Sequence, residues 1–330
     1  GKLDLLAIQP DNAGLKIFRN LGSIYFKDIT KTSGIPTQIT GALKLVMDDW
    51  NNDDMLDLFI PRTGESPMFL QVILPVGISF YTFQTLSYSI DLYRGTIEVE
   101  RNLLRFATYV AFFPQLVAGP IIRASDLLPQ FARSPRLTRE AATLGLLLIV
   151  WGLFKKTIVA SELSVNLVDP VFFDPSAYGA LDIAAAVYGY AVQIYCDFSA
   201  YSDMAIGTGL LLGYSFPRNF DQPYRASSMQ QFWRRWHISL SSWLRDYLYV
   251  PLGGGKKGLW SSSLNVMITM LLGGLWHGAA WTFVAWGALH GGVQVIERLG
   301  RAAFGGRKVI PTVVGVLVTF HIVCLGWILF

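Results

Sequence analysis

The sequence QFWRRWHISLSSWLRDYLYVPLGGG (residues 231–255), a short basic link and LNVMITMLLGGLWHGAAWTFVAW (residues 264–286) decide the fold. Two histidines in this stretch, His237 and His277, each follow a tryptophan in a mostly apolar setting. A titratable ring inside an apolar segment is costly to bury, and by default it marks a functional site. We therefore expect both imidazole rings to face one interior passage.

The composition is that of an integral membrane protein. Of the 330 residues, 52% are hydrophobic and 15% are charged, and the mean hydropathy is +0.40; soluble domains carry about 25% charged residues. The basic residues punctuate apolar segments, which suits loops at the cytoplasmic face of a membrane rather than a nucleic-acid surface. The clearest of them are Arg133, Arg136, Arg139, Lys155 and Lys156. Cys196 and Cys324 lie in apolar runs, which predicts buried small side chains rather than a disulfide or a metal site.

Residues 1–70 have a different character, with short strand-like runs separated by Gly, Asn and Asp turns. The runs are LDLLAI (3–8), LKIFRN (15–20), IYFKDIT (24–30) and LDLFIP (56–61). One segment places oxygen-bearing side chains at alternating positions and closes them with a further carboxylate, a pattern that can wrap calcium but is also that of an ordinary turn. Its candidate ligands are Asp49, Asn51, Asp53 and Asp57.

This first segment resembles FG-GAP, or VCBS-type, propeller repeats, on phrases such as FRNLG (18–22) and FKDIT (26–30). A propeller buries its core between several blades, and this segment supplies about one. We therefore expect a short β-rich, propeller-repeat-like fragment at 1–70, joined to an unrelated domain at 71–330.

From residue 71 the chain predicts a mainly α, multi-spanning membrane protein. A helix crosses a bilayer with about 20 apolar residues. The candidate runs are Val72–Tyr93, Ala141–Ala160, Leu181–Tyr214, Leu264–Trp286 and Val309–Phe330. Phe106–Ile122 is interrupted by prolines and predicts a broken or re-entrant piece, which is tolerated only where protein or water covers the backbone. We expect a loop at Val165–Tyr178, where two prolines occur.

Helical spacing places each histidine on a face. A capping box of Ser227 with Gln230, or of Ser228 with Gln231, predicts a helix start. The helix that follows would carry one stripe at four-residue steps, and that stripe consists of Trp233, His237, Ser241 and Arg245. In the next run Gly274, His277, Trp281 and Val284 would share a face, and the small residues Gly273, Gly274 and Gly278 would let another backbone approach.

Two carboxylates, Asp197 and Asp203, lie inside the apolar run 181–214 and need partners there. Either they sit at a helix break and pair with a nearby Arg or Tyr, or Asp197 lines the passage and orients a histidine. Arg235 and its neighbours could hold a phosphate-bearing donor, or they could anchor the chain at the membrane interface.

Residues from about 72 to 330 resemble the membrane-bound O-acyltransferase family, in its bacterial alginate O-acetyltransferase branch. The matching phrases are LPVGISFYTFQTLSYSIDLYRG (74–95), FFPQLVAGPI (112–121), the run from Tyr195 to Gly207, FWRRWHISLSSWLRDYLYVPLGG (232–254) and LLGGLWHGAAWTFVAWGALHG (271–291). The family motif places its principal catalytic histidine at His277, within LWHG, and an accessory histidine at His237, within RRWH. Asp197, Trp276, Arg235 and Ser241 are the candidate substrate-binding residues beside them.

The resemblance implies a tunnelled helical body in the bacterial inner membrane, crossed several times by the chain. It implies acyl transfer from a cytoplasmic thioester to a hydroxyl of an exported polysaccharide or its relay protein. We expect no tightly bound cofactor: the donor is acetyl-CoA or a carrier-protein thioester. The expected partners are the lipid bilayer, the acyl donor and periplasmic polysaccharide-acetylation proteins, with no nucleic acid. An imidazole suits a general base, since its reference pKa of about 6.5 lies near working pH.

Two departures from the family pattern leave alternatives open. The propeller-like piece stands where family members have several spanning helices, and the final helices end early, so the transferase domain is expected to be partial. One alternative is D-alanyl-type transfer from a carrier protein. Another is a catalytically inactive fragment with a calcium-binding extracellular module. His290 and His321 are expected to be ordinary buried residues, with His290 turned well away from the His277 face and His321 bonded to a carbonyl of a neighbouring helix.

Overall fold

The computed structural model describes five strands between residues 5 and 59, and then residues 77–307 and 310–330. The chain divides into two compact units, Gly1–Pro75 and Val76–Phe330. Each unit is described by itself.

In the first unit the described residues form two small antiparallel sheets. β1 (Leu5–Ile8), β2 (Leu15–Gly22) and β3 (Tyr25–Asp28) form one sheet in that order, with Leu5 opposite Phe18 and a register shift between Asn20 and Gly22. β4 (Val46–Asp48) pairs with β5 (Asp57–Phe59). Strands therefore occur in the four strand-like runs, with β4 in addition. The propeller-repeat assignment itself stays a prediction.

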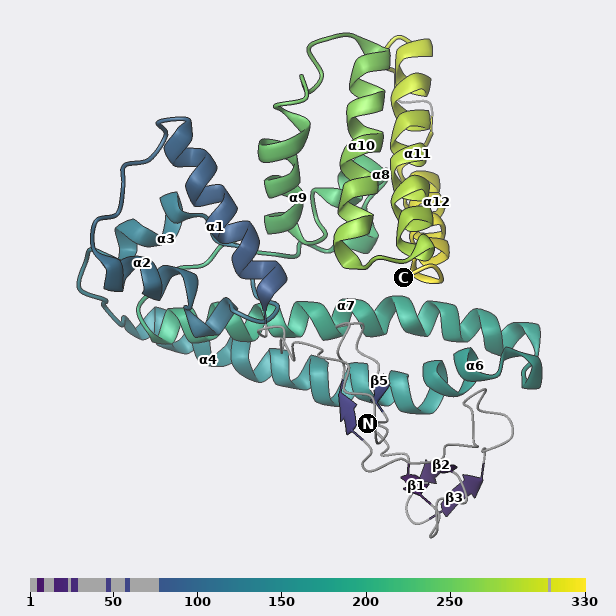
Figure 1. Cartoon of the computed structure of the whole chain (residues 1–330). Coiled ribbons are helices and arrows are strands. Elements are labelled where there is room, and N and C mark those ends of the chain that lie inside the picture. The colour runs from purple at the N-terminus through teal and green to yellow at the C-terminus, as the bar shows by residue number, and fades with distance from the viewer. Residues whose placement is uncertain are drawn as a thin grey trace, which may run out of the picture. The chain divides into compact units, whose positions relative to one another are not determined.

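In the second unit the regular secondary structure of the described residues is all helical (Figure 1). The first elements are α1 (Ile78–Tyr93), α2 (Leu103–Val110), the 3₁₀ turn η2 (Phe113–Gln115) and α3 (Ala124–Phe131). They are followed by α4 (Arg139–Leu153), α7 (Ala180–Leu211), α8 (Met229–Trp233), α9 (Ile238–Leu244), the π-helical turn η7 (Arg245–Tyr249), α10 (Leu259–His277), α11 (Trp281–Ala303) and α12 (Thr312–Trp327). The predicted break in Phe106–Ile122 is confirmed, because α2 ends at Val110 and only η2 follows.

One prediction about the middle of the chain is wrong. The expected loop from Val165 is helical, since α4 continues through two π-helical stretches, η3 (Phe154–Ala160) and η4 (Ser164–Val168), and through α5 (Ser161–Leu163) and α6 (Asp169–Phe173). Pro170 does not end the helix, which continues from η4 through α6 to Phe173.

This continuous helix packs antiparallel against α7 (Figure 1). Glycines set the closeness of the crossing. A Cβ on Gly145 would lie 2.8 Å from the Gly207 carbonyl oxygen, and a Cβ on Gly207 would lie 2.6 Å from the Gly145 oxygen. Further along, a Cβ on Gly152 would lie 2.7 Å from the Ala200 oxygen. The two backbones are therefore in direct contact, as small residues allow in membrane helix pairs.

α10 and α11 form a second antiparallel pair, and the expectation of a single run from Leu264 to Trp286 is wrong. The helix ends at His277, Gly278–Ala280 are extended or turned, and α11 starts at Trp281. The predicted close approach at Gly274 is confirmed, because a Cβ there would lie 2.3 Å from the Phe283 oxygen. The shared face that would have included Trp281 does not exist, and that side chain is 86% exposed.

Two helices among the described residues are long and apolar enough to cross a membrane: the 35-residue helix Arg139–Phe173 and α10. Only 17% of the most apolar window of Arg139–Phe173 is buried. The core helix of a soluble protein would be mostly covered, whereas this helix exposes a face of leucine, valine and aromatic side chains. The face is suited to lipid. Cys196 and Cys324 are free and buried, as predicted.

Candidate active site

His277 is the last residue of α10, and it lies in a ring of aromatic side chains. Its imidazole centroid is 4.7 Å from that of Trp276, 4.7 Å from Phe330 and 5.3 Å from Trp286. The residue as a whole is intermediate in exposure. A helix end rather than a helix middle carries this group, because the chain turns at Gly278. The ring therefore projects at the junction of α10, α11 and the C-terminal residues.

His237 lies where the predicted stripe is interrupted. It has φ of 42° and ψ of 57° and stands between α8 and α9, so that Trp233, His237, Ser241 and Arg245 do not share one continuous helix. The helix start itself is confirmed: the Ser228 hydroxyl accepts a hydrogen bond from Gln231 N at 3.1 Å. The imidazole of His237 is 2% exposed, and its Nε2 has no hydrogen-bond partner among the described residues.

Asn219 holds the backbone that follows His237. Its carbonyl oxygen accepts from Ile238 N at 2.9 Å, and its Oδ1 accepts from both the backbone N (3.2 Å) and the hydroxyl (2.9 Å) of Ser239. The Ser239 hydroxyl in turn accepts from Ile121 N at 2.9 Å. Asn219 is 1% exposed. A left-handed non-glycine residue is uncommon and costs energy, and these bonds fix it from outside the helix.

Trp276 stands between the two candidate histidines. Its ring is 6.3 Å from that of His237 and 4.7 Å from that of His277, measured between centroids. Phe80 and Phe83 of α1 close the other side, with Phe80 6.3 Å from His237 and Phe83 5.2 Å from Trp276. The structure thus brings the two predicted histidines and Trp276 into one aromatic cluster, with the tryptophan separating the imidazoles.

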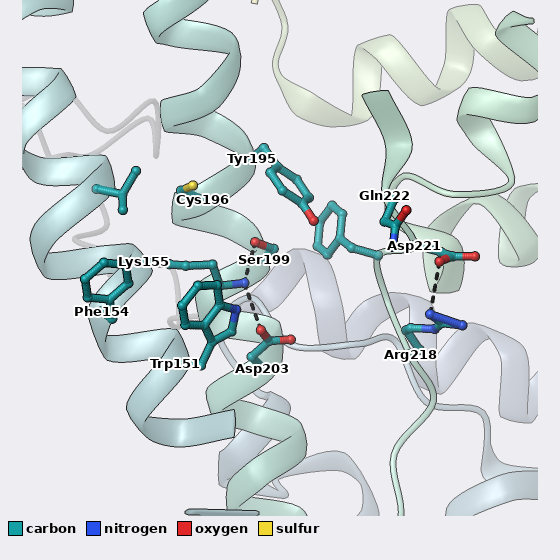
Figure 2. A pocket seen from close by; sticks show the side chains of 12 residues that line it. Trp151, Phe154, Lys155, Tyr195, Cys196, Ser199, Asp203, Arg218, Asp221 and Gln222 are labelled. Atoms are coloured by element: carbon teal, nitrogen blue, oxygen red, sulfur yellow. Dashed lines mark hydrogen bonds and ion pairs between the residues drawn. The ribbon is translucent and has the colours of Figure 1, made fainter. Parts of the chain in front are cut away.

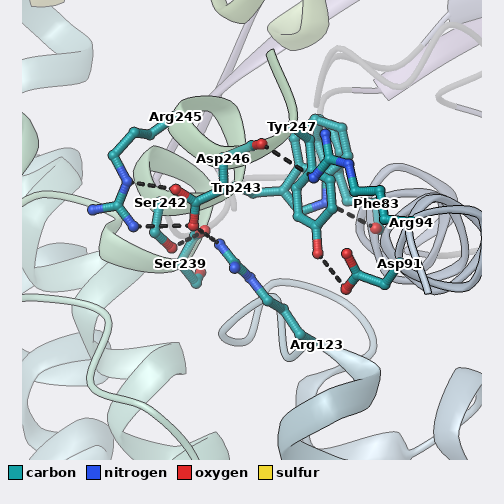
Figure 3. A network of polar contacts seen from close by, with 10 residues as sticks. All are labelled: Phe83, Asp91, Arg94, Arg123, Ser239, Ser242, Trp243, Arg245, Asp246 and Tyr247. Carbon is teal, nitrogen blue, oxygen red and sulfur yellow. Dashed lines mark hydrogen bonds and ion pairs between the residues drawn. The ribbon is translucent and has the colours of Figure 1, made fainter. Parts of the chain in front are cut away.

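A polar network ties α1 to α9 and η7 beside this cluster (Figure 3). Tyr247 donates to Asp91 at 2.6 Å, and the Trp243 indole donates to the Phe83 carbonyl at 3.0 Å. Asp246 accepts from Arg123 at 2.7 Å and from Arg245 at 2.6 Å. Phe83 belongs to the polar network through its carbonyl and to the aromatic cluster through its ring. The network therefore fixes the position of α1 beside Trp276.

Asp246 lies outside the two candidate membrane spans and carries a shifted pKa. Burial alone would raise the pKa of this carboxyl, but hydrogen bonds from Arg245 and Arg123 favour the ionised form, and the pKa lies below its usual range. Arg245 was predicted on the His237 stripe; in the structure it pairs with Asp246 instead.

Asp197 pairs with Lys156, and both side chains are about half exposed. No contact joins Asp197 to either candidate histidine among the described residues, so a tunnel-lining role for it has no geometric support. Asp203 pairs with Lys155 at 2.8 Å. Lys155 is only 7% exposed. The expectation that Lys155 sits in a cytoplasmic loop is therefore wrong: the residue lies inside the long helix and turns toward α7, where carboxylate and hydroxyl partners compensate its charge.

Lys155 and Asp203 line a cavity of about 380 Å³ (Figure 2). The Lys155 ammonium reaches both Asp203 and the Ser199 hydroxyl, the latter at 2.7 Å. Arg218, 3.0 Å from Asp221, lies on the far wall. The cavity is lined by neither His237 nor His277. It has two positive and two negative side chains, so it shows no preference for an anionic or a cationic guest.

The two remaining predicted substrate-binding residues bond to the backbone. The Ser241 hydroxyl donates to the Trp236 carbonyl at 3.1 Å, across the turn that contains His237. The Arg235 guanidinium donates to the Asp221 carbonyl at 3.4 Å. Both residues support the loop around His237; their substrate-binding roles stay predictions.

His290 is buried, as expected. It is 0% exposed, and its ring lies 4.6 Å from Trp286, the same indole that His277 approaches. The expectation that it turns well away from His277 is wrong, because the helix that carries it starts anew at Trp281, so spacing counted from His277 loses its meaning. The expectation for His321 is wrong: the residue is exposed, and its Nδ1 lies 2.7 Å from the Leu317 carbonyl of its own helix.

The calcium candidates stay predictions. Asp49, Asn51 and Asp53 lie outside the described residues, and Asp57 is described only as part of the β5 backbone. Within the described residues, no group of His, Cys, Asp and Glu could hold a metal ion.

Comparison with known proteins adds the family. A model of the membrane-bound O-acyltransferase family matches residues 97–305. The probable alginate O-acetylase AlgI of Azotobacter vinelandii is 45% identical over 280 residues, which cover 84% of this chain and 55% of that protein. A peptidoglycan O-acetyltransferase of Helicobacter pylori is 36% identical, over 79% of this chain and 54% of its own length. A teichoic acid D-alanyltransferase of Bacillus subtilis is 26% identical, over 77% and 68%.

The chain spans about half the length of the alginate and peptidoglycan relatives. The family match covers α2 to α11 and includes both histidines and Trp276. The chain therefore belongs to the membrane-bound O-acyltransferase family.

Proposed function

We propose that this protein is a membrane O-acyltransferase that moves an acetyl group from a thioester donor to a hydroxyl group. One observation carries the proposal: the ring of His277, at the end of α10, and the ring of His237 both approach the ring of Trp276 within one aromatic cluster. Among the residues that the structure describes, neither imidazole forms an ion pair, and both lie in apolar surroundings, which favours a chemical role.

In the proposed reaction, a neutral nitrogen of His277 accepts the proton of the acceptor hydroxyl as its oxygen attacks the thioester carbonyl. A C–O bond forms, the C–S bond breaks, and the thiolate leaves with the proton that His277 returns. No oxidant, metal or resident cofactor enters this balance. Positioned proton transfer of this kind contributes about a hundred- to ten-thousand-fold in rate.

His237 would act as the accessory group, and its rigid backbone supports that assignment. Asn219 fixes the turn that holds it, so the imidazole needs no rearrangement to present Nε2. Trp276 would form the shared wall between donor and acceptor. Ser241 and Arg235 would stabilise this turn from its outer side through their hydrogen bonds to backbone carbonyls. Asp197 remains the weakest of the proposed substrate contacts, because its charge is already met by Lys156.

The relatives suggest the acceptor class. Those with higher identity are named for acetylation of alginate and of peptidoglycan, and a more distant one for D-alanylation of teichoic acid. We propose an exported polysaccharide, or a protein that relays to one, as acceptor, and acetyl-CoA or a carrier-protein thioester as cytoplasmic donor. The setting would be the bacterial inner membrane, with several spans and periplasmic acetylation proteins as partners.

For residues 1–70 we propose an FG-GAP/VCBS-like repeat fragment with calcium ligands in Asp49, Asn51, Asp53 and Asp57. The antiparallel sheets at Leu5–Asp28 and Val46–Phe59 agree with a β-rich repeat. A calcium titration of the full chain, read by the unfolding midpoint, tests this part. An unchanged midpoint at millimolar calcium rejects the metal site.

The transferase proposal is tested with the full chain in proteoliposomes, radiolabelled acetyl-CoA and a polysaccharide acceptor. We expect label in the polysaccharide with the wild-type chain, loss of at least a hundredfold in His277→Ala, and wild-type transfer in the control His321→Ala. Full transfer by His277→Ala would refute the assigned base. Transfer of label from a D-alanyl carrier protein, with none from acetyl-CoA, would show that the carrier-protein thioester is the donor.

A further inference from the structure

The described residues contain eight buried side-chain N and O atoms without a hydrogen-bond partner, and four of them lie in one cluster. The cluster consists of Nε1 of Trp233, Nε1 of Trp286, and both ring nitrogens of His290. Ring centroids of the three residues lie 4.6 to 5.5 Å apart. Buried polar groups are nearly always paired, so each exception needs a cause.

Other buried indoles of this protein do find partners. Trp243 donates to the Phe83 carbonyl at 3.0 Å, and Trp327 donates to the Tyr224 hydroxyl at 3.2 Å. The fold can therefore satisfy an indole N–H when the group is only structural. Leaving buried polar groups unpaired is energetically costly, because each has lost its hydrogen bonds to water. An apolar residue such as leucine would avoid that cost at position 290.

The cluster adjoins His277 and is held from two helices. Trp286 has its ring 5.3 Å from His277 and 4.6 Å from His290, so the indole lies between the two imidazoles. On the other side α12 abuts the His290 ring, because a Cβ on Gly326 would lie 2.6 Å from Nε2. Figure 1 shows α8, α11 and α12 gathered in this part of the unit. His290 thus has a fixed place one ring away from the proposed base.

The chemistry of the cluster indicates what it binds. A neutral imidazole offers one N–H and one lone pair, and each indole offers one N–H. The three side chains together carry three donors and one acceptor. A guest rich in oxygen lone pairs complements such a set, as the hydroxyl, ring and carboxylate oxygens of a saccharide do.

We infer that Trp233, Trp286 and His290 form a polar subsite next to His277 that binds the hydroxyl-bearing acceptor of the transfer reaction. The inference rests on the proposed transferase function and names a residue, His290, that touches the acceptor without removing its proton. Its alternative is a site filled by water alone.

The first test measures binding without turnover. The unfolding midpoint of the full chain in detergent is recorded with and without an oligosaccharide prepared from alginate, and with no donor present. We expect the saccharide to raise the midpoint of the wild-type chain and of His321→Leu, and not that of His290→Leu. His290→Leu without saccharide should unfold no lower than wild type, because it removes two unpaired polar atoms. No shift in the wild-type chain, or an equal shift in His290→Leu, overturns the subsite.

The second test separates KM from kcat for the acceptor. Loss of one or two neutral hydrogen bonds corresponds to about a tenfold rise in KM. We expect this rise in His290→Leu and in Trp286→Phe, which keeps the aromatic packing, and partial recovery in His290→Gln. Donor hydrolysis in the absence of acceptor should stay unchanged in the control His321→Leu. An unchanged KM in both variants overturns the subsite while His277→Ala still tests the base, so the two proposals fail separately.

Discussion

Two neighbouring ion pairs between the long helix and α7 differ in burial, and they predict different costs for one kind of mutation. Lys155 pairs with Asp203 with side chains 9% and 24% exposed, whereas Lys156 pairs with Asp197 with side chains 52% and 46% exposed. Asp203→Asn and Asp197→Asn each remove one negative charge and keep the shape. Only the first leaves an ammonium group buried without a counter-charge.

The magnitude follows from that burial. Removing one partner of a buried pair costs about 3–5 kcal/mol, and the quarter exposure of Asp203 places Asp203→Asn near the lower end, at about 3 kcal/mol. Lys155 retains the Ser199 hydroxyl at 2.7 Å, which also moderates the loss. Exposed pairs are worth about 0–1 kcal/mol, so Asp197→Asn should have little effect.

The assay is equilibrium unfolding in mixed micelles, followed by circular dichroism, on the two single variants and on Lys155→Met/Asp203→Leu. The double variant should recover most of the lost stability, because an apolar pair fills the same space without a charge. Equal losses for Asp203→Asn and Asp197→Asn would refute the reasoning, since burial would then not decide the cost. Failure of the double variant to recover would assign the loss to packing.

Three further perturbations test other parts of the structure. Gly274→Ala should separate α10 from α11 and lower the unfolding midpoint, because its Cβ would lie 2.3 Å from the Phe283 carbonyl oxygen. The matched control Gly292→Ala, whose Cβ would have nothing within 4 Å, should be neutral or stabilising by up to about 1 kcal/mol. Equal unfolding midpoints for the two variants would contradict the close packing. Asn219→Ala should lower the free energy of unfolding by about 1–3 kcal/mol and reduce acyl transfer, since it leaves the buried backbone N–H and hydroxyl of Ser239 without their acceptor. Wild-type transfer in this variant would show that the turn needs no such support. Asp246 has a folded-state pKa below its unfolded value, so its contribution to stability is present above about pH 4 and is lost as pH falls through the folded pKa. In Asp246→Asn the loss of stability at acid pH should therefore be smaller than in the wild-type chain. An unchanged stability–pH curve would exclude this carboxyl as a source of the acid-dependent loss.

The places of the long helices could be predicted from apolar runs, but their ends could not. Leu181–Tyr214 became α7 almost as predicted, because 32 residues of helix need only composition and the absence of breakers. The turn between α10 and α11 could not be predicted from the sequence, because the turn at Gly278 contains no proline that would mark the end of a helix. The glycine that was interpreted as a packing residue also ends the helix.

Pairing partners explain the other misses. Lys155 looks like an interfacial lysine in sequence, and its burial depends on Asp203 and Ser199, which lie more than forty residues away. His290 was set aside for its spacing from His277, and three-dimensional proximity arises through Trp286 after the chain reverses. Local patterns carry no information on such long-range contacts.

The interruption of the helix at His237 connects the strain of the fold to its chemistry. Four-residue spacing favours one continuous helix from Met229, yet Asn219 offers Ile238 and Ser239 a hydrogen-bonding alternative from another segment. That alternative holds His237 at a positive φ, at a cost of about 1–3 kcal/mol for a residue with a side chain. A continuous helix would project the imidazole in the direction of a helical side chain, whereas the turn presents its ring edge-on to Phe198 and near Trp276. The strained backbone is therefore what brings the accessory imidazole to the tryptophan that His277 also contacts, and it persists because Asn219 and Ile121 bond the same serine from two sides.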